Sequence, residues 1–221
     1  MFDIQRNYLS AGHRLRPGGN HEKTSVTIHS TGNPGSTAKN ERDWLDNPGN
    51  DRDAAWHYVV GDGEVIQAIP DEETAWHSGD PEGNMTSLGI EIIETGDRRA
   101  VLDTAAEFTA GKLRERGLLP GAMRTHKSWS GKNCPRILLD REFVRDGLDW
   151  EWFSARVGYY MEENEMEKIY NSLDEIPEWY AGAVKKLIDK GYLVGNEKGE
   201  LGLSETALKV FTVNDRAGLY D

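Results

Sequence analysis

The chain of 221 residues contains a single cysteine, Cys134. One cysteine cannot close an intrachain disulfide, which leaves a buried apolar side chain, a nucleophile, a metal ligand or an intermolecular bridge. Free cysteines are most often buried. Here, however, polar and turn-forming residues flank the cysteine instead of a hydrophobic run: Lys132, Asn133, Pro135 and Arg136. This setting predicts a loop at the surface or in a cleft.

Long apolar runs are also missing. No segment approaches the 18 or more apolar residues of a membrane span, and the start, MFDIQRNYLSAGHRLRPGG, lacks the hydrophobic region and cleavage site of a signal peptide. We therefore expect a soluble protein that is made in a cytoplasm and has no membrane partner. Basic residues are few: 26 Lys plus Arg face 38 Asp plus Glu, a net charge of −12. This balance disfavours binding to nucleic acid or anionic lipid.

The first part of the chain mixes strand and helix patterns. SVTIHST alternates apolar and polar residues, which predicts a strand with His29 off its apolar face. AWHYVV, a GDG turn and EVIQAI predict a β-hairpin, and LGIEII predicts a third strand. Residues 101–116 carry apolar side chains at helical spacing and end at a plausible capping glycine, Gly117. The stretch between His29 and the hairpin is polar and partly helical, so the fold class is α/β.

A composition shift divides the chain. The run YMEENEME, at 160–167, is rich in Glu and indicates a linker or the frayed end of a helix. We expect a first domain over 1–155, a linker over 156–167 and a small, mainly helical module over 168–221. Within the module, the apolar spacing predicts one helix over 176–193 and a second through Leu208.

Several polar side chains stand out against this pattern. Glu91 lies within the apolar strand LGIEII, where a buried carboxylate is costly unless it has a partner, so either an exposed face, an ion pair or a functional role is expected. His29 lies near a strand end, where polar groups commonly line a cleft. His57 alternates with apolar residues and fits a satisfied, partly buried histidine. His77 lies on a loop after Trp76, where substrate contact and simple packing are both open.

Three residues have the ligand types that zinc prefers. His29, His126 and Cys134 offer two nitrogens and one sulfur, and three protein ligands leave a fourth position for water, as a catalytic zinc requires. One ligand lies nearly a hundred residues from the other two, so the fold must bring them together. A nucleophilic hydrolase that uses Cys134 and His126 without a metal is the competing interpretation.

Five motifs in order resemble a known family. VTIHSTGNPGS, AWHYVVGDG, TAWHSG, SLGIEI and THKSWSGKNCPRIL, spread over roughly residues 1–150, resemble the zinc-dependent N-acetylmuramoyl-L-alanine amidases of the type 2 amidase and peptidoglycan-recognition-protein superfamily. The resemblance is closest to the amidase domains of bacteriophage endolysins. It implies a mixed central β-sheet flanked by helices, with a small, mainly helical C-terminal domain beside it.

The resemblance also implies roles for individual residues. His29, His126 and Cys134 would bind Zn²⁺, Glu91 would act as general base, and Lys132 would stabilise the oxyanion. Residues expected to contact the substrate are Trp56, where many relatives carry a tyrosine, and His57, Trp76 and His77.

The implied reaction is hydrolysis of the amide between N-acetylmuramic acid and L-alanine in bacterial peptidoglycan. An endolysin would be made in the host bacterial cytoplasm without a signal peptide and would reach the wall after release. Alternatives are a non-catalytic peptidoglycan-binding receptor and a cytoplasmic muropeptide-recycling amidase. The module, in which residues 172–195 faintly resemble a surface-layer-homology motif, would bind the cell wall or form a homodimer.

Overall fold

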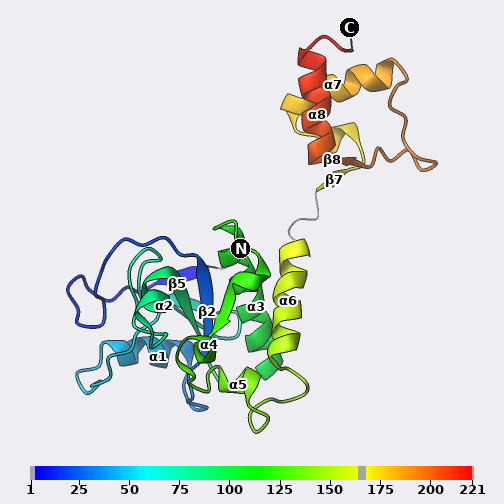
Figure 1. Cartoon of the computed structure of the whole chain (residues 1–221). Coiled ribbons are helices and arrows are strands. Elements are labelled where there is room, and N and C mark those ends of the chain that lie inside the picture. Colours follow the sequence, from blue (N-terminus) through cyan, green and yellow to red (C-terminus); the bar gives the residue numbers. More distant parts are fainter. Residues whose placement is uncertain (1–2, 164–167, 221) are drawn as a thin grey trace. The chain divides into compact units, whose positions relative to one another are not determined.

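The computed structural model describes residues 3–163 and 168–220. The chain divides into two compact units, Met1–Glu162 and Glu163–Asp221 (Figure 1). Each unit has its own hydrophobic cluster. Among the described residues, none of the helices combines the length and the apolar character that a membrane crossing needs.

A six-stranded mixed sheet forms the centre of the first unit, with strand order β1-β4-β3-β5-β2-β6. Strands β3 and β4 pair antiparallel, which confirms the predicted hairpin, and the other neighbours pair parallel. The bounds are Ile4–Arg6 (β1), Ser25–Ser30 (β2), Tyr58–Val60 (β3), Val65–Gln67 (β4), Ser87–Ile92 (β5) and Met123–Thr125 (β6). The fold class predicted from the sequence, α/β with a mixed central sheet, is confirmed.

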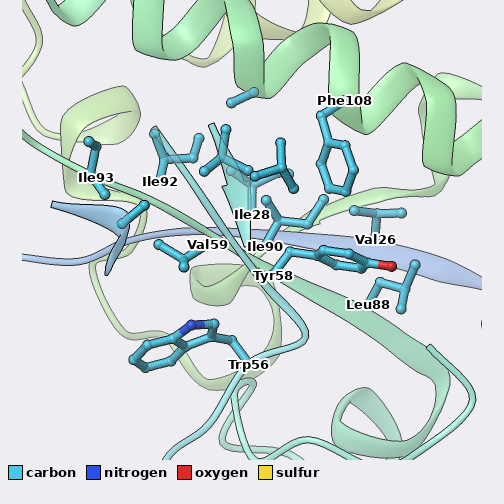
Figure 2. Packing of buried hydrophobic residues seen from close by; sticks show 14 of the residues in the cluster. Val26, Ile28, Trp56, Tyr58, Val59, Leu88, Ile90, Ile92, Ile93 and Phe108 are labelled. Atoms are coloured by element: carbon cyan, nitrogen blue, oxygen red, sulfur yellow. The ribbon is translucent and has the colours of Figure 1, made fainter. Parts of the chain in front are cut away.

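Strands β2 and β5 lie side by side in the middle of this sheet, and their alternating residues separate two faces. Ile28 and Ile90 pair in register and pack with Phe108 of α3 (Arg98–Arg114), whereas Trp56 lies on the opposite side of the strands (Figure 2). Since β2 is buried along its whole length, His29 is not on an exposed face. Its side chain lies on the face away from α3, where burial favours polar groups that have partners.

Helices cover the sheet. The predicted helix over 101–116 is α3, which begins three residues earlier because the Asp97 side chain accepts a hydrogen bond from the Ala100 amide. The long helix α6 (Trp150–Glu163) packs against α3, and Arg156 pairs with Asp103 across the contact. Shorter helices in this unit are α1 (Ala38–Leu45), α2 (Pro81–Thr86), α4 (His126–Ser130) and α5 (Arg136–Leu139), with a 3₁₀ turn at Pro120–Ala122.

The predicted start of the linker, residue 156, is wrong. Helix α6 continues to residue 163 because Val157 and Met161 of this segment are buried in the core of the first unit. The glutamates of the predicted linker that fall inside α6 lie in its last turns, which accounts for the linker-like composition. The rest of that linker, 164–167, lies outside the described residues.

The second unit is small and mainly helical. Helices α7 (Glu178–Asp189) and α8 (Glu205–Arg216) pack against each other. Helix α8 contacts β8 (Leu203–Ser204), which pairs antiparallel with β7 (Ile169–Tyr170), and α7 contacts a 3₁₀ turn at Leu173–Glu175. Its core is formed by Tyr170, Ile176, Val184, Leu203 and Leu208. Both predicted helices are present, and α7 starts after Pro177.

Candidate metal centre

The pairing of β2 with β6 closes the sequence gap between the candidate ligands. His29 lies near the end of β2, and His126 is the first residue of α4, directly after β6. Because β2 and β6 are parallel neighbours, their carboxyl ends meet at one edge of the sheet. Cys134 follows in the loop after α4. The potential ligand atoms of the three buried residues all lie within 4.8 Å of one another.

Local hydrogen bonds hold the loop that carries these residues. The Thr125 side chain caps α4 by accepting a bond from the Ser128 amide, and Gly131 ends the helix with a φ of +79° that favours glycine. The Lys127 amide donates to the Cys134 carbonyl at 3.1 Å, which folds the loop back onto the helix. Trp129 Nε1 donates to Thr27 Oγ1 at 2.9 Å and ties α4 to β2.

The cluster presents two nitrogens and one sulfur toward a common point. His29 Nδ1 lies 3.0 Å from His126 Nδ1 and 3.7 Å from Cys134 Sγ. Burial lowers the pKa of His29 well below its ordinary value, and burial together with the charge of Lys132 lowers the pKa of His126 to about 4. Both imidazoles are therefore neutral at physiological pH, the form that binds metals. These donors suit a borderline-soft cation such as zinc.

A second histidine sets the tautomer of His29. His77 Nε2 lies 3.2 Å from the Ser87 carbonyl, which can only accept, so His77 carries its proton there and its Nδ1 is an acceptor. His29 Nε2 lies 3.0 Å from that Nδ1 and must donate to it. The remaining nitrogen, His29 Nδ1, then has no proton and keeps its lone pair free toward His126 and Cys134.

His57 lies beside His77 and is held by backbone hydrogen bonds. Its Nδ1 accepts a bond from the Gly89 amide at 2.9 Å, and its Nε2 donates to the Glu73 carbonyl at 2.9 Å. Burial lowers the pKa of His57 to about 3. A Cβ at position 89 would lie 2.7 Å from the His77 ring, so glycine is required there for β5 to approach that ring.

Glu91 pairs in register with His29, on the neighbouring strand β5, so both side chains lie on the same face of the sheet. Its Oε2 is buried and has no hydrogen-bond partner among the described residues. Burial, with a contribution from the charge of Glu41, raises the pKa of Glu91 to about 8. The positive charge of Lys132 acts in the opposite direction. A carboxyl group in such a setting can hold or release a proton near neutral pH.

Glu91 and Lys132 line a cavity of about 110 Å³ together with Trp56. A larger hollow of about 600 Å³ is lined by several of the same residues, including Glu41 and Arg52. The substrate contacts predicted from the sequence divide here: Trp56 lines the cavity. The other three do not, since His57 and His77 are buried behind the metal cluster and Trp76 packs against the core.

Sequence reasoning missed Glu41 and Arg52 on the cavity wall. A signal for Glu41 was present, because Thr37 and Asn40 form a capping box at the start of α1, and the helical period then places Glu41 on the inner face with Ala38 and Leu45. Arg52 lies in an irregular segment, for which the sequence carries no such pattern.

The sequence profile of the N-acetylmuramoyl-L-alanine amidases matches residues 19–137. The chain belongs to this amidase family. The matched segment contains all three cluster residues as well as Glu91 and Lys132.

Two similar proteins are N-acetylmuramoyl-L-alanine amidases of Bacillus subtilis. N-acetylmuramoyl-L-alanine amidase XlyA of Bacillus subtilis (strain 168) is 35% identical over 164 residues, which covers 72% of this chain and 52% of XlyA. CwlH of the same organism is 35% identical over 147 residues, 63% of this chain and 58% of CwlH. The chain thus spans about half the length of these curated relatives.

Solved structures show the same fold for the amidase unit. The catalytic domain of XlyA superposes with a TM-score of 0.63 at 34% identity, covering 71% of this chain and 99% of that domain. A mutant endolysin from Bacillus subtilis gives 0.64 at 34% identity, covering 72% of this chain and 100% of the endolysin.

Proposed function

We propose that this chain is a zinc-dependent N-acetylmuramoyl-L-alanine amidase that acts as an endolysin on bacterial peptidoglycan. It would hydrolyse the amide between the lactyl group of N-acetylmuramic acid and L-alanine of the stem peptide. The observation that carries the proposal is the convergence of His29, His126 and Cys134 beside Glu91, all within the segment that matches the amidase family. The relatives named as amidases and the endolysin structures support the same reaction.

Zinc fits the donors of the cluster. Two neutral imidazole nitrogens and one cysteine sulfur are ligands that zinc accepts in catalytic sites with three protein ligands, which leave one position for water. The bond from His29 to His77 leaves His29 Nδ1 unprotonated and orients it as a ligand. When bound, zinc supplies a Lewis acid and lowers the pKa of a water molecule to about 7.

Glu91 would move the proton. Its carboxylate takes the proton from the attacking water and passes it to the nitrogen of the leaving L-alanine. Burial favours this second task, because it raises the pKa of Glu91, so that the carboxyl group holds the proton taken from water until the leaving nitrogen accepts it. Its unpartnered, buried Oε2 has no competing hydrogen bond among the described residues.

Lys132 and Trp56 would serve the substrate. Both line the cavity that holds Glu91. The Lys132 ammonium stabilises the negative charge that develops on the amide oxygen, since a fixed positive charge in a cavity is worth more than one in bulk water. Trp56 contributes an apolar wall to this cavity.

Two alternatives are less well supported by the geometry. A non-catalytic peptidoglycan receptor would not need the third ligand Cys134, Glu91 and Lys132 together. A Cys–His hydrolase would need an accessible thiol beside His126, whereas Cys134 is 5% exposed and its sulfur contacts His29 Nδ1. Removal of zinc by a chelator should abolish the amidase activity and leave a thiol hydrolase active.

Mass spectrometry of digested cell walls tests the reaction. We expect free lactyl carboxylates on muramic acid and stem peptides with a free L-alanine amino terminus, and we expect both to disappear after chelation and return with zinc. New reducing sugar ends, or cleavage within the stem peptide, would overturn the proposed bond. Products from intact walls also separate an endolysin from a cytoplasmic muropeptide-recycling amidase, which would act on soluble fragments alone.

We further propose that the module over 168–221 holds the enzyme on the wall. The module presents large apolar side chains to solvent, among them Trp179 at 69% and Tyr192 at 73% exposure. Tethering a catalytic domain to an insoluble polymer raises its effective concentration there. Formation of a homodimer through the same side chains is the competing role.

A further inference from the structure

A second cavity of the amidase unit contains a cluster of arginines. Its volume is about 560 Å³, and its lining includes Arg98, Arg136, Arg145, Glu94, Phe143 and Pro34. The neighbours of Pro34 in the chain, Asn33 and Gly35, line the hollow of about 600 Å³ beside the candidate catalytic residues. The loop that follows β2 therefore separates this arginine pocket from that hollow.

The carboxylate of the arginine pocket is fully engaged. Glu94 Oε2 accepts bonds from Arg136 Nε at 3.1 Å and Nη2 at 2.6 Å, and Oε1 accepts from Arg136 Nε and the Gly32 amide, both at 3.0 Å. The Glu94 side chain is 2% exposed. Arg136 also lies over the Phe143 ring at 4.2 Å. Glu94 and Arg136 thus neutralise each other and form a fixed wall.

The other two arginines have no such partner. Among the residues that the structure describes, no carboxylate lies within 4 Å of the Arg98 or Arg145 guanidinium, and Arg98 Nη1 makes a long contact of 3.4 Å to the Phe143 carbonyl. Three arginines against one glutamate give the pocket a formal charge of +2, in a chain whose net charge is −12. This excess of positive charge in one cavity favours an anionic ligand.

Arg98 also lies close to the other charges of the pocket. It is the first residue of α3, directly after Asp97, whose carboxylate caps the helix. Burial lowers the pKa of Arg98; the charge of Glu94 acts against this, and the charges of Arg145 and Arg136 lower the pKa further. An anion in the pocket would relieve the repulsion among the guanidinium groups.

We propose that the arginine pocket binds a carboxylate of the peptidoglycan stem peptides, as a subsite apart from the cavity where the amide is cut. This inference rests on the proposed function. The planar guanidinium groups of Arg98 and Arg145 match a carboxylate in shape and charge. A stem peptide carries carboxylates along its length, and the pocket is one loop away from the catalytic hollow, so a single polymer can reach both.

Paired substrates test the subsite. One substrate is a soluble muropeptide with free stem carboxylates, and the other is the same muropeptide amidated at those groups. Both are tested with the wild type, Arg98→Gln and Arg145→Gln. Arg141→Gln is the control, because Arg141 is exposed and lies outside the pocket. We expect each pocket variant to raise the KM for the free-acid substrate by about ten-fold, as loss of a charge-assisted hydrogen bond implies. For the amidated substrate, the kcat and the KM of the pocket variants should equal those of the wild type.

Different failures have different meanings. Equal KM values for the two substrates in the wild type, with cleavage intact, would overturn the subsite alone. No cleavage of either substrate would overturn the proposed function and the subsite with it. Arg145 is exposed, so Arg145→Gln reports on the pocket even if Arg98→Gln perturbs folding. Binding of the variants is also compared on walls with and without their phosphodiester polymers. If the pocket variants bind more weakly than the wild type only when these polymers are present, the pocket binds phosphate and the carboxylate proposal is overturned.

Discussion

His29 Nε2 lies 3.0 Å from His77 Nδ1, so two buried imidazoles share one proton whose position is fixed. The far nitrogen of His77 must keep its own proton for the Ser87 carbonyl, 3.2 Å away. The chain of bonds therefore runs in one direction, from His29 to His77 to β5, and leaves His29 Nδ1 free for a metal. A residue that the sequence suggested as a substrate contact is placed instead to orient a ligand.

His77→Ala should weaken zinc binding without removing a ligand. Loss of the acceptor lets His29 rotate or take its proton on Nδ1, and such supporting partners are worth about 10- to 100-fold in metal affinity. His77→Gln, whose side-chain carbonyl can accept the same proton, should lose less. Competition with a chromogenic chelator measures the affinity, and His21→Ala is the control. Equal zinc affinity of His77→Ala and wild type would contradict this role.

Substitution of any one of the three cluster residues should lower the zinc content of the protein. We expect about one zinc per chain in the wild type and lower occupancy in His29→Ala, His126→Ala and Cys134→Ser, because each removes a donor. Metal analysis of the purified, folded variants measures this. Unchanged zinc content in all three would remove the proposed site.

Glu91→Ala should keep its zinc and lose most wall hydrolysis, by about 10²- to 10⁴-fold, the usual contribution of a general base or acid. Loss of turbidity of a wall suspension gives the rate, and Lys132→Ala should show a loss of the same kind. Glu72→Ala, an exposed carboxylate outside the cavity, is the matched control. Near-normal hydrolysis by Glu91→Ala would rule out the assigned role.

Local patterns in the sequence predicted the central elements, and long-range contacts explain the rest. The alternation around His29 and the hairpin turn after AWHYVV depend on neighbours in the chain, and both strands are present. The role of His77 depends on the Ser87 carbonyl of β5, and that of Arg98 depends on Arg136 and Arg145, which follow Cys134 in the chain. No local pattern encodes those contacts, and a glutamate-rich helix end such as that of α6 has the composition of a linker.

The buried carboxyl group of Glu91 should make the metal-free protein less stable as the pH rises. Its pKa is 4.5 in an unfolded chain and about 8 in the fold, so between these values the folded state holds a proton that the unfolded state has released. Stability therefore falls across this window and levels off above about pH 8. Glu91→Gln lacks the ionisation, so its advantage over wild type should grow from pH 5 to pH 9 and reach the order of a few kcal/mol. Urea unfolding at both pH values measures it, with Glu72→Gln as control, and parallel pH profiles for wild type and Glu91→Gln would contradict it.

A protein that ends at residue 163 should test the C-terminal module, because α6 and the core of the amidase unit then stay intact. It should cleave soluble muropeptides at the wild-type rate and lose binding to intact walls, since the catalytic cavity lies wholly in the first unit. Pelleting with purified walls measures binding, and light scattering measures mass. In the full chain, Trp179→Ala should weaken pelleting more than Lys198→Ala, an exposed polar control in the same module. Undiminished pelleting of the shortened protein, with a mass that falls from dimer to monomer, would assign assembly to the module instead of wall binding.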